Sequence, residues 1–439
     1  MNGLPSLIGS STCETAELFR LVKYLFEHYQ SNLSEMHISE ELFDFAAALL
    51  DALYAYEDTL HLLNSDFAFW EAINSAREKY IEQIMLGFSS NKKVFSPDEL
   101  NNLLTRMLKH LDNSVQKSYD TATGLYHTYY YYRVTNYELV TDNNGNHIYL
   151  DNGPLAMPTA FERVNLPAFL EGQVRVLKIL ENAFNKNMLY EAVQNSQLYD
   201  AKLKMYKVNA PLTKATNSIG RARIFTPGWL ENESVWMHME YKYLLEVLKS
   251  GLCDSFFNDM KHALVPFMDI TKYGRSPLEH SSFIVSGAHP TESLHSRGYY
   301  ARLTGATVEF ISMYLIMIGM KKPFTIDEDQ NLIFELTPVL PGYLFKREVS
   351  THMLSTDKGS MSIELPSGTF SSIIFSNTML VYHNSELKNT YGTNAVKVTS
   401  YKLTDWNNNV YQVNENSIRG NLASSIRSGV FKRIDVTLD

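Results

Sequence analysis

The chain has 439 residues, of which 45% are hydrophobic and 20% charged, and its formal net charge at pH 7 is −9. This composition supplies enough apolar material for a folded core and excludes a disordered chain. The charges form no basic stripe, so we expect no nucleic-acid partner. The longest apolar run, residues 308–320, is too short to cross a bilayer, so we expect no membrane partner.

The amino terminus, MNGLPSLIGSSTCETAELF, lacks a positive segment followed by an apolar core, which predicts a cytoplasmic protein without a secretory signal. Cys13 and Cys253 are far apart in the sequence and support neither a disulfide framework nor a cysteine metal site. Motifs typical of zinc and calcium sites are absent. We therefore expect no metal and no cofactor.

Up to about residue 325, apolar side chains recur at intervals of three and four residues, which predicts helices. The predicted helices cover residues 13–30, 39–63, 66–87, 97–118, 166–186, 231–250, 253–268 and 298–320. Helices that follow one another without strands favour a mainly α fold, with helix pairs stacked or closed into a ring. Aromatic residues and an Asn-Gly pair within 124–150 predict a hairpin inserted near 120–165.

After residue 330 the hydrophobic period changes to two, and turn residues separate the short apolar runs. This pattern predicts a C-terminal β-sandwich. We therefore place a helical, catalytic-type domain at 1–328 and the β-sandwich at 329–439. The segment DWNNN, residues 405–409, lies between two such runs and is typical of a hairpin turn.

The segment FTPGWLENESVWMHMEYKYLL, residues 225–245, places polar and aromatic side chains in front of a predicted helix. They are Trp229, Glu231, Asn232, Trp236 and His238. The free amides and the dipole of a helix start favour acceptors and anions there. Helix capping by Asn232 over a tryptophan core is the alternative, but capping does not explain the whole set, and we favour a sugar-binding function.

A second segment, residues 288–310, concentrates hydrogen-bond donors around a loop that enters a helix. They are His289, His295, Arg297, Arg302, Thr304, Gly305 and Thr307. A guanidinium, a hydroxyl and exposed amides suit phosphate and other anions. A solvated loop explains these residues equally well, although a glycine inside a helix costs roughly 1 kcal/mol relative to alanine.

Two further sets have simpler explanations. Glu162, Arg163, Asn165 and Glu171 lie where a loop meets a helix, and a structural ion pair is the favoured interpretation. The aromatic residues from Tyr126 to Tyr132 present ring faces that suit sugars, but packing within a hairpin is favoured.

Three segments resemble the cellobiose and chitobiose phosphorylases. PGWLENESVWMH is similar to that family's PG..ENGG....H region, with Glu231, Asn232 and His238 at corresponding spacing. SRGYYARLTGATVEF resembles its G....RTG.A.W segment, with Thr304 and Gly305 on the Thr-Gly pair, and LTPVLPGYLF resembles its entry to a C-terminal β-domain. Glu233 and Ser234 depart from the family's Gly-Gly.

The resemblance implies an (α/α)6 barrel and inverting phosphorolysis of a β-linked gluco-oligosaccharide or disaccharide, which releases an α-sugar 1-phosphate. Inorganic phosphate is then a co-substrate, held by His238, Thr304, Gly305 and Arg302. The sugar subsite is lined by Glu231, Asn232, Trp229, Trp236 and Arg297. Related enzymes commonly pair, so the resemblance also implies a homodimer.

The same resemblance raises a question about the general acid. In the family the acid lies in an Asp-Trp-Asn-Asp stretch before a Gly-Glu-Ser helix, and SSTCETAELFRLVKYL resembles that helix, with Glu14 on its glutamate. The acid would then precede Met1, so we expect a C-terminal portion of a longer enzyme, with an N-terminal polypeptide as partner. Within the chain, Glu162 and Glu171 remain as candidates.

Two alternatives stay open. A glycoside hydrolase on the same barrel would use Glu162, Glu171 or Glu231 as the acid and water in place of phosphate. A non-catalytic carbohydrate-binding protein would keep the sugar subsite without the chemistry. The residues do not identify the sugar or its linkage.

Overall fold

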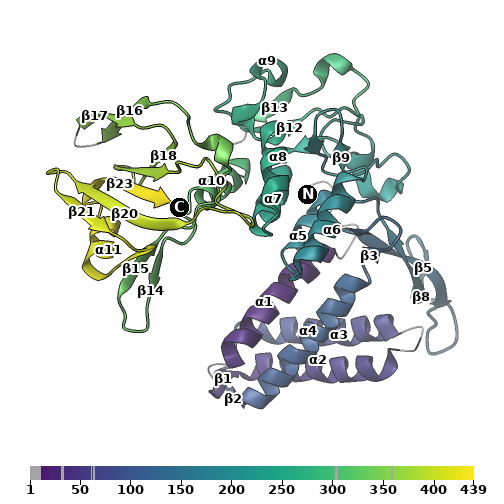
Figure 1. The fold of residues 1–439 in the computed structure, drawn as a ribbon. Coiled ribbons are helices and arrows are strands. Elements are labelled where there is room, and N and C mark those ends of the chain that lie inside the picture. Colours follow the sequence, from purple (N-terminus) through teal and green to yellow (C-terminus); the bar gives the residue numbers. More distant parts are fainter. Residues whose placement is uncertain (1–10, 31–33, 61, 63–64, 302–304, 357–358) are drawn as a thin grey trace. The chain divides into compact units, whose positions relative to one another are not determined.

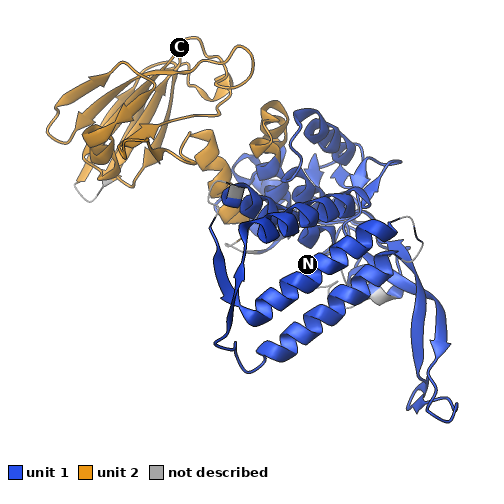
Figure 2. Cartoon of the chain, turned by 90° about the horizontal axis from the view of Figure 1, so that it is seen from below, with its two compact units in different colours: residues 1–246, 262–301 blue, residues 247–261, 302–439 orange. Residues whose placement is uncertain are grey.

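The computed structural model describes residues 11–30, 34–60, 62, 65–301, 305–356 and 359–439. They form two compact units, which Figure 2 colours separately. Unit 1 comprises residues 1–246 and 262–301, and unit 2 comprises residues 247–261 and 302–439. The domain boundary predicted after residue 328 stays a prediction.

Unit 1 begins with four long helices (Figure 1): α1 (Thr12–Gln30), α2 (Glu40–Thr59), α3 (Ser65–Ile84) and α4 (Pro97–Gln116). Strands β1 (Met36–Ser39) and β2 (Lys92–Phe95) pair antiparallel beside them. The Ser96 hydroxyl accepts from the Glu99 amide, and the Glu99 side chain accepts from the Ser96 amide, which forms a capping box. Buried apolar side chains join α2 to α4 and α1 to α4 in two clusters: Ala46, Leu53, Phe95 and Leu103, and Val22, Leu104 and Leu111.

An aromatic hairpin follows the four helices. Strands β3 (Tyr119–Asp120) and β4 (Leu125–Tyr126) pair first. Strands β5 (Tyr130–Leu139) and β8 (Ala156–Asn165) then pair antiparallel in a two-stranded ribbon, which Figure 1 shows as a long hairpin. Strands β6 (Tyr149–Leu150) and β7 (Gly153–Pro154) pair near its tip. Gly145 donates from its backbone to the Asp142 carbonyl at 3.0 Å, so the Asn-Gly pair lies in a turn.

The rest of unit 1 combines short helices with short strands. Its elements are α5 (Leu170–Leu177), α6 (Ala183–Gln194), β9 (Tyr199–Asp200), β10 (Met205–Tyr206), η1 (Asn217–Arg223), β11 (Val235–Trp236), α7 (Met237–Lys249), η2 (Val265–Phe267), α9 (Ile270–Tyr273), β12 (Ser281–Ile284), η3 (Glu292–Leu294) and β13 (Gly298–Ala301). Helix α7 begins in unit 1 and ends in unit 2. Strands β11, β12 and β13 form a three-stranded antiparallel sheet in that order.

Unit 2 contains most of α8 (Cys253–Ala263) and all of α10 (Gly305–Met317), η4 (Gly342–Leu344) and α11 (Gly420–Arg427). Its strands are β14 (Phe324–Ile326), β15 (Leu332–Glu335), β16 (Ser350–Thr356), β17 (Gly359–Leu365), β18 (Thr369–Ile374), β19 (Thr378–His383), β20 (Val398–Asp405), β21 (Val410–Val413), β22 (Ser417–Arg419) and β23 (Phe431–Leu438). A five-stranded sheet has the order β18-β19-β23-β20-β21. The β16–β17 hairpin packs on β19 through Leu354, Ile363, Leu365, Met379 and Val381.

The predicted mainly α fold, with an (α/α)6 barrel and a β-sandwich, is wrong. Helices account for 39% and strands for 27%, so the structure is a mixture of both. The ranges 231–250 and 298–320 are each predicted as one helix, but each contains a strand followed by a helix. Strand β11 precedes α7 in the first range, and β13 precedes α10 in the second. The C-terminal sheet is mixed, because β23 pairs parallel with β19 and antiparallel with β20.

The barrel prediction relies on hydrophobic spacing, which does not reveal a local break in the helical backbone. Leu230 and Glu233 have φ angles of 49° and 60°, which interrupt a helix, so α7 begins only at Met237. Across the described ranges, no helix combines the length and apolarity needed to cross a membrane.

Candidate functional site

The predicted sugar-binding segment folds as a strained turn. Gly228, Leu230 and Glu233 adopt φ angles of 81°, 49° and 60°. The Gly228 amide donates to the Asn232 carbonyl at 2.8 Å, and the Asn232 amide donates to the Trp229 carbonyl at 3.2 Å. Left-handed φ angles disfavour residues with a Cβ by about 1–2 kcal/mol, so the surroundings must hold this conformation. We call residues 226–234 the site turn.

Asn209, which lies before the site turn in the sequence, holds it in place. Its buried side chain donates from Nδ2 to the Glu231 carbonyl and accepts at Oδ1 from the Glu233 amide at 2.8 Å. The Val208 amide donates to the Ser234 carbonyl at 2.8 Å. Sequence reasoning missed Asn209, because the segment around it has neither a periodic pattern nor a recognisable motif.

Asn232 serves the structure of the turn. Its Nδ2 donates to the Phe225 carbonyl at 2.7 Å, and its Oδ1 accepts from the Leu212 amide at 3.4 Å. The residue is fully buried. Both the donor and the acceptor of this amide therefore have a partner within the protein, which gives Asn232 a role in positioning the turn, and its predicted sugar contact stays a prediction.

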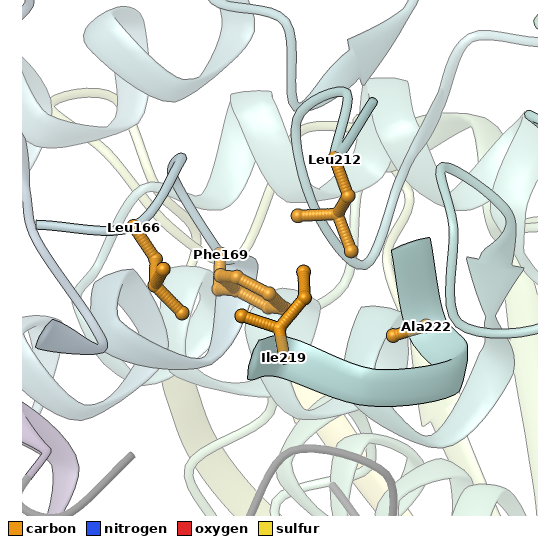
Figure 3. Close-up of a cluster of buried hydrophobic side chains, with 5 residues drawn as sticks. All are labelled: Leu166, Phe169, Leu212, Ile219 and Ala222. Atoms are coloured by element: carbon orange, nitrogen blue, oxygen red, sulfur yellow. The ribbon is translucent and has the colours of Figure 1, made fainter. Parts of the chain in front are cut away.

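A small apolar core supports the segments beside the site turn. Figure 3 shows its five side chains grouped together: Leu166, Phe169, Leu212, Ile219 and Ala222. The Phe169 backbone forms a β-bridge with Asn209, and Ile219 and Ala222 belong to η1. This core therefore supports Asn209, which is hydrogen-bonded to the site turn, and the short helix η1, which contains Arg221.

Glu231 has an unsatisfied carboxylate oxygen. The residue is 7% exposed. Its Oε1 accepts from Arg221 Nη2 at 3.3 Å, whereas Oε2 is buried and has no hydrogen-bond partner among the described residues. An ionised carboxylate has about four acceptor positions, and leaving a buried one empty is unfavourable. A ligand hydroxyl is a suitable partner for this oxygen.

A second carboxylate of the site turn forms an ion pair. Lys207 Nζ lies 2.8 Å from Glu233 Oε1, and their side chains are only 10% and 8% exposed. Such a pair is held by its surroundings, and removal of one partner leaves a buried charge. The buried ion pair between Lys207 and Glu233 therefore helps to hold the site turn in its conformation.

The three-stranded sheet brings the two predicted segments together. Trp236 of β11 pairs with Phe283 of β12, which pairs with Tyr299 of β13. The Trp229 ring lies 5.0 Å from the Phe283 ring and 4.7 Å from the Tyr299 ring. Trp229 and Trp236 thus share one aromatic cluster with the segment that the sequence predicts to bind anions.

The loop between β12 and β13 packs directly on the site turn. A Cβ on Gly228 would lie 2.6 Å from the His289 backbone nitrogen, so only glycine fits there. The His289 carbonyl lies 2.7 Å from His295 Nε2, while His295 Nδ1 is buried without a partner among the described residues. Arg297 is exposed at the end of this loop, and its carbonyl accepts from the Val285 amide at 3.0 Å.

His238 is the second residue of α7 and is half-buried beside Trp236, with ring centroids 5.8 Å apart. Burial, reinforced by the charge of Lys242, lowers the pKa of His238 to about 4. The imidazole is therefore neutral at pH 7. A neutral imidazole offers one N–H donor and one acceptor to a ligand.

The sequence offers two carboxylates, Glu162 and Glu171, as candidates for the general acid. Glu171 Oε2 accepts from the Tyr129 hydroxyl at 2.9 Å, and its Oε1 lies 3.3 Å from Arg175 Nη2. Burial by itself raises the pKa of Glu171, but the Tyr129 hydrogen bond and the Arg175 charge bring this pKa below its usual value. Glu171 is thus ionised at pH 7 and is better suited to accept a proton than to donate one. Glu162 is exposed on β8 and pairs with Arg133.

The predicted phosphate-binding residues are only partly described. Arg302 and Thr304 lie outside the described residues. Gly305 is the first residue of α10 and belongs to unit 2, whereas His238 belongs to unit 1. The phosphate site therefore stays a prediction. Within the described ranges, no group of three or more His, Cys, Asp or Glu residues is placed to hold a metal ion.

Neither a protein-family model nor a curated protein sequence matches this chain.

Proposed function

We propose that this protein acts on carbohydrates, and that it cleaves a β-linked gluco-oligosaccharide by inverting phosphorolysis with the sugar held at the site turn. The observation that carries this proposal is the buried Glu231 Oε2, which has no hydrogen-bond partner among the described residues. A sugar hydroxyl donates to such an oxygen and satisfies it. Trp229, which lies two residues before Glu231 in the site turn and is half-buried, is the aromatic ring proposed to pack against the sugar C–H groups.

Glu233 supports the resemblance to the phosphorylases. This residue stands where the family motif has its first glycine, and its φ angle is 60°. Glycine adopts that conformation without strain. The turn therefore keeps the backbone form that suits the family's glycine, even though the side chain differs.

In the proposed reaction, phosphate attacks the anomeric carbon from the face opposite the glycosidic bond. The C–O bond to the leaving sugar breaks, and its oxygen takes a proton from a general acid, which stays unassigned. The neutral imidazole of His238 is the proposed donor to phosphate in unit 1. Its lowered pKa fits a role as a hydrogen-bond donor rather than as a cation.

Incubation with β-linked gluco-oligosaccharides, with and without inorganic phosphate, tests the proposal. We expect phosphate-dependent release of α-sugar 1-phosphate. Glu231→Gln removes a charged acceptor and should lower kcat/KM about 10- to 100-fold. Glu292→Gln is the control, since that side chain is 83% exposed. Phosphate-independent release of reducing sugar, or binding without turnover, would contradict phosphorolysis.

One observation favours hydrolysis as a second candidate. The ionised Glu171, held by Tyr129 and Arg175, has the charge state that a general base needs to activate water in an inverting hydrolase. Glu171→Gln then abolishes phosphate-independent sugar release, with the Tyr129 hydroxyl left in place. If the release persists in this variant, Glu171 is not the base.

A further inference from the structure

The hairpin of β5 and β8 carries aromatic side chains that the site turn does not use. The Tyr130 and Tyr132 rings lie 5.8 Å apart, the Tyr132 and Phe161 rings 6.2 Å, and the Phe161 and Phe67 rings 5.2 Å. Trp70 of α3 stacks on Phe67 at 5.9 Å. These five residues form a continuous series of rings across three elements, α3, β5 and β8, and we call them the aromatic row.

Strand register explains how part of the row forms. Tyr132 pairs with Arg163, and Val134 pairs with Phe161. Alternate residues of a strand share a face, so Tyr130, Tyr132 and Phe161 lie on the same side of the ribbon. Trp70 is 58% exposed, Tyr132 54% and Phe161 36%. Single exposed aromatics are ordinary, but a connected series of them indicates an interaction surface.

Polar groups accompany the rings. The Arg163 guanidinium lies 4.3 Å from the centre of the Tyr130 ring, and its Nε donates to Asn165 Oδ1 at 3.0 Å. Its Nη2, and Thr159 Oγ1 nearby in β8, are buried without a hydrogen-bond partner among the described residues. Leaving such buried groups unpaired is unfavourable, and a ligand with hydroxyl groups would relieve it.

We propose that the aromatic row is an accessory binding surface for linear β-glucan chains. It deepens the proposed function, on which it rests for the class of sugar, by making long chains the preferred substrates. The C–H faces of successive sugar units pack on the electron-rich ring faces, and sugar hydroxyls pair with Arg163 and Thr159. The apolar surface of a protein partner would instead leave those two polar groups buried and unpaired.

Affinity measurements test the surface independently of turnover. Binding of soluble linear β-1,3- and β-1,4-glucans is measured by titration calorimetry for the wild type, Trp70→Ala and Tyr132→Ala. Tyr137→Ala is the matched control, because Tyr137 is 59% exposed on the same hairpin and lies outside the row. We expect Kd to rise at least tenfold in the two row variants and to stay unchanged in the control.

Two further readouts separate the possible outcomes. Turnover of a disaccharide should be equal in the wild type and Tyr132→Ala, because the Tyr132 ring contacts Tyr130 and Phe161, neither of which belongs to the site turn. Absence of all turnover with glucan binding retained would defeat the proposed function and leave the row intact. Unchanged glucan affinity in both row variants overturns the row, as does a dimer, detected by sedimentation, that only the row variants lose.

Discussion

At the scale of single residues, the buried ion pair between Lys207 and Glu233 stabilises the site turn. The variant Glu233→Gly tests this contribution. The substitution relieves the strain at φ 60°, worth about 1–2 kcal/mol. It also leaves Lys207 buried without its partner at 2.8 Å, which is unfavourable by about 3–5 kcal/mol. We therefore expect a net loss of roughly 1–4 kcal/mol in the free energy of unfolding in urea.

The double variant Lys207→Met/Glu233→Gly is the control for that prediction. It removes both charges and keeps the relieved backbone, so it should be more stable than Glu233→Gly alone. A Glu233→Gly variant that is more stable than the wild type by the relieved strain, about 1–2 kcal/mol, would show that the ion pair contributes nothing.

His238 gives a second residue-scale prediction, on pH. Its pKa falls from 6.5 to about 4 on folding, because burial and then Lys242 disfavour the charged form. Below about pH 6.5 the unfolded chain binds a proton that the folded chain does not, so stability falls as pH drops towards 4. The loss is at most on the order of 3 kcal/mol.

Urea unfolding of the wild type and His238→Asn between pH 7 and pH 4.5 measures this effect. The variant should lose less stability than the wild type over that range. Parallel losses in the two proteins would mean that the imidazole titrates normally in the folded state.

The motifs in the sequence indicate that residues 225–245 and 288–310 belong to one site. They do not indicate which residues elsewhere in the chain hold the site turn in place. Trp229, Glu231 and Trp236 come from the segment that the sequence singled out, and the segment predicted to bind anions packs beside Trp229 and Gly228. Asn209 and Lys207 could not be predicted, because their roles depend on a tertiary approach that no local pattern records.

At the scale of elements, Gly228 couples the site turn to the loop after β12. Gly228→Ala places a Cβ 2.6 Å from the His289 nitrogen at a φ of 81°. Gly251→Ala is the matched control, since its φ is 80° and nothing lies within 4 Å. We expect Gly228→Ala to lower the free energy of unfolding by about 1–3 kcal/mol more than the control, by chemical denaturation. Equal losses would mean that the loop moves aside freely.

Regular elements were predicted better than the turns between them. Helices α1 to α4 match the predicted ranges within a few residues, because long amphipathic patterns with serine caps are strong local signals. The turn at DWNNN is confirmed, with Asp405 Oδ1 accepting from the Asn407 and Asn409 amides at 2.9 and 2.8 Å. The helix predicted from residue 231 is wrong at its start, because hydrophobic spacing does not reveal which residues have positive φ angles.

At the scale of the whole molecule, the last strand in the chain lies in the middle of the unit 2 sheet. Strand β23 pairs with β19 on one side and β20 on the other. A chain that ends at Val430 lacks that central strand, including the buried Ile434. The side chains that pack around Ile434 would then be exposed to solvent. We expect such a chain to lose cooperative unfolding of unit 2 and to be cleaved rapidly within it by protease.

Removal of Asp439 alone is the control, because it leaves all of β23 in place. Equal protease resistance of the two truncated chains would contradict the central position of β23.

Periodicity alone could not predict the mixed architecture. Apolar spacing predicts that a segment is helical, but it does not predict whether successive helices close into a ring. Short strands such as β9 to β13 have too few residues for a period-two signal, so the sequence pattern predicts only helices and loops between residues 199 and 301. The parallel pairing of β19 and β23 depends on the path through α11, which is a property of the chain as a whole.

A crystal structure of the protein soaked with a β-linked gluco-oligosaccharide tests the sugar site most directly. We predict a sugar hydroxyl within about 3 Å of Glu231 Oε2, with a pyranose ring against Trp229. Density for the sugar away from the site turn, with Glu231 Oε2 bonded to another protein group, would contradict the proposed function.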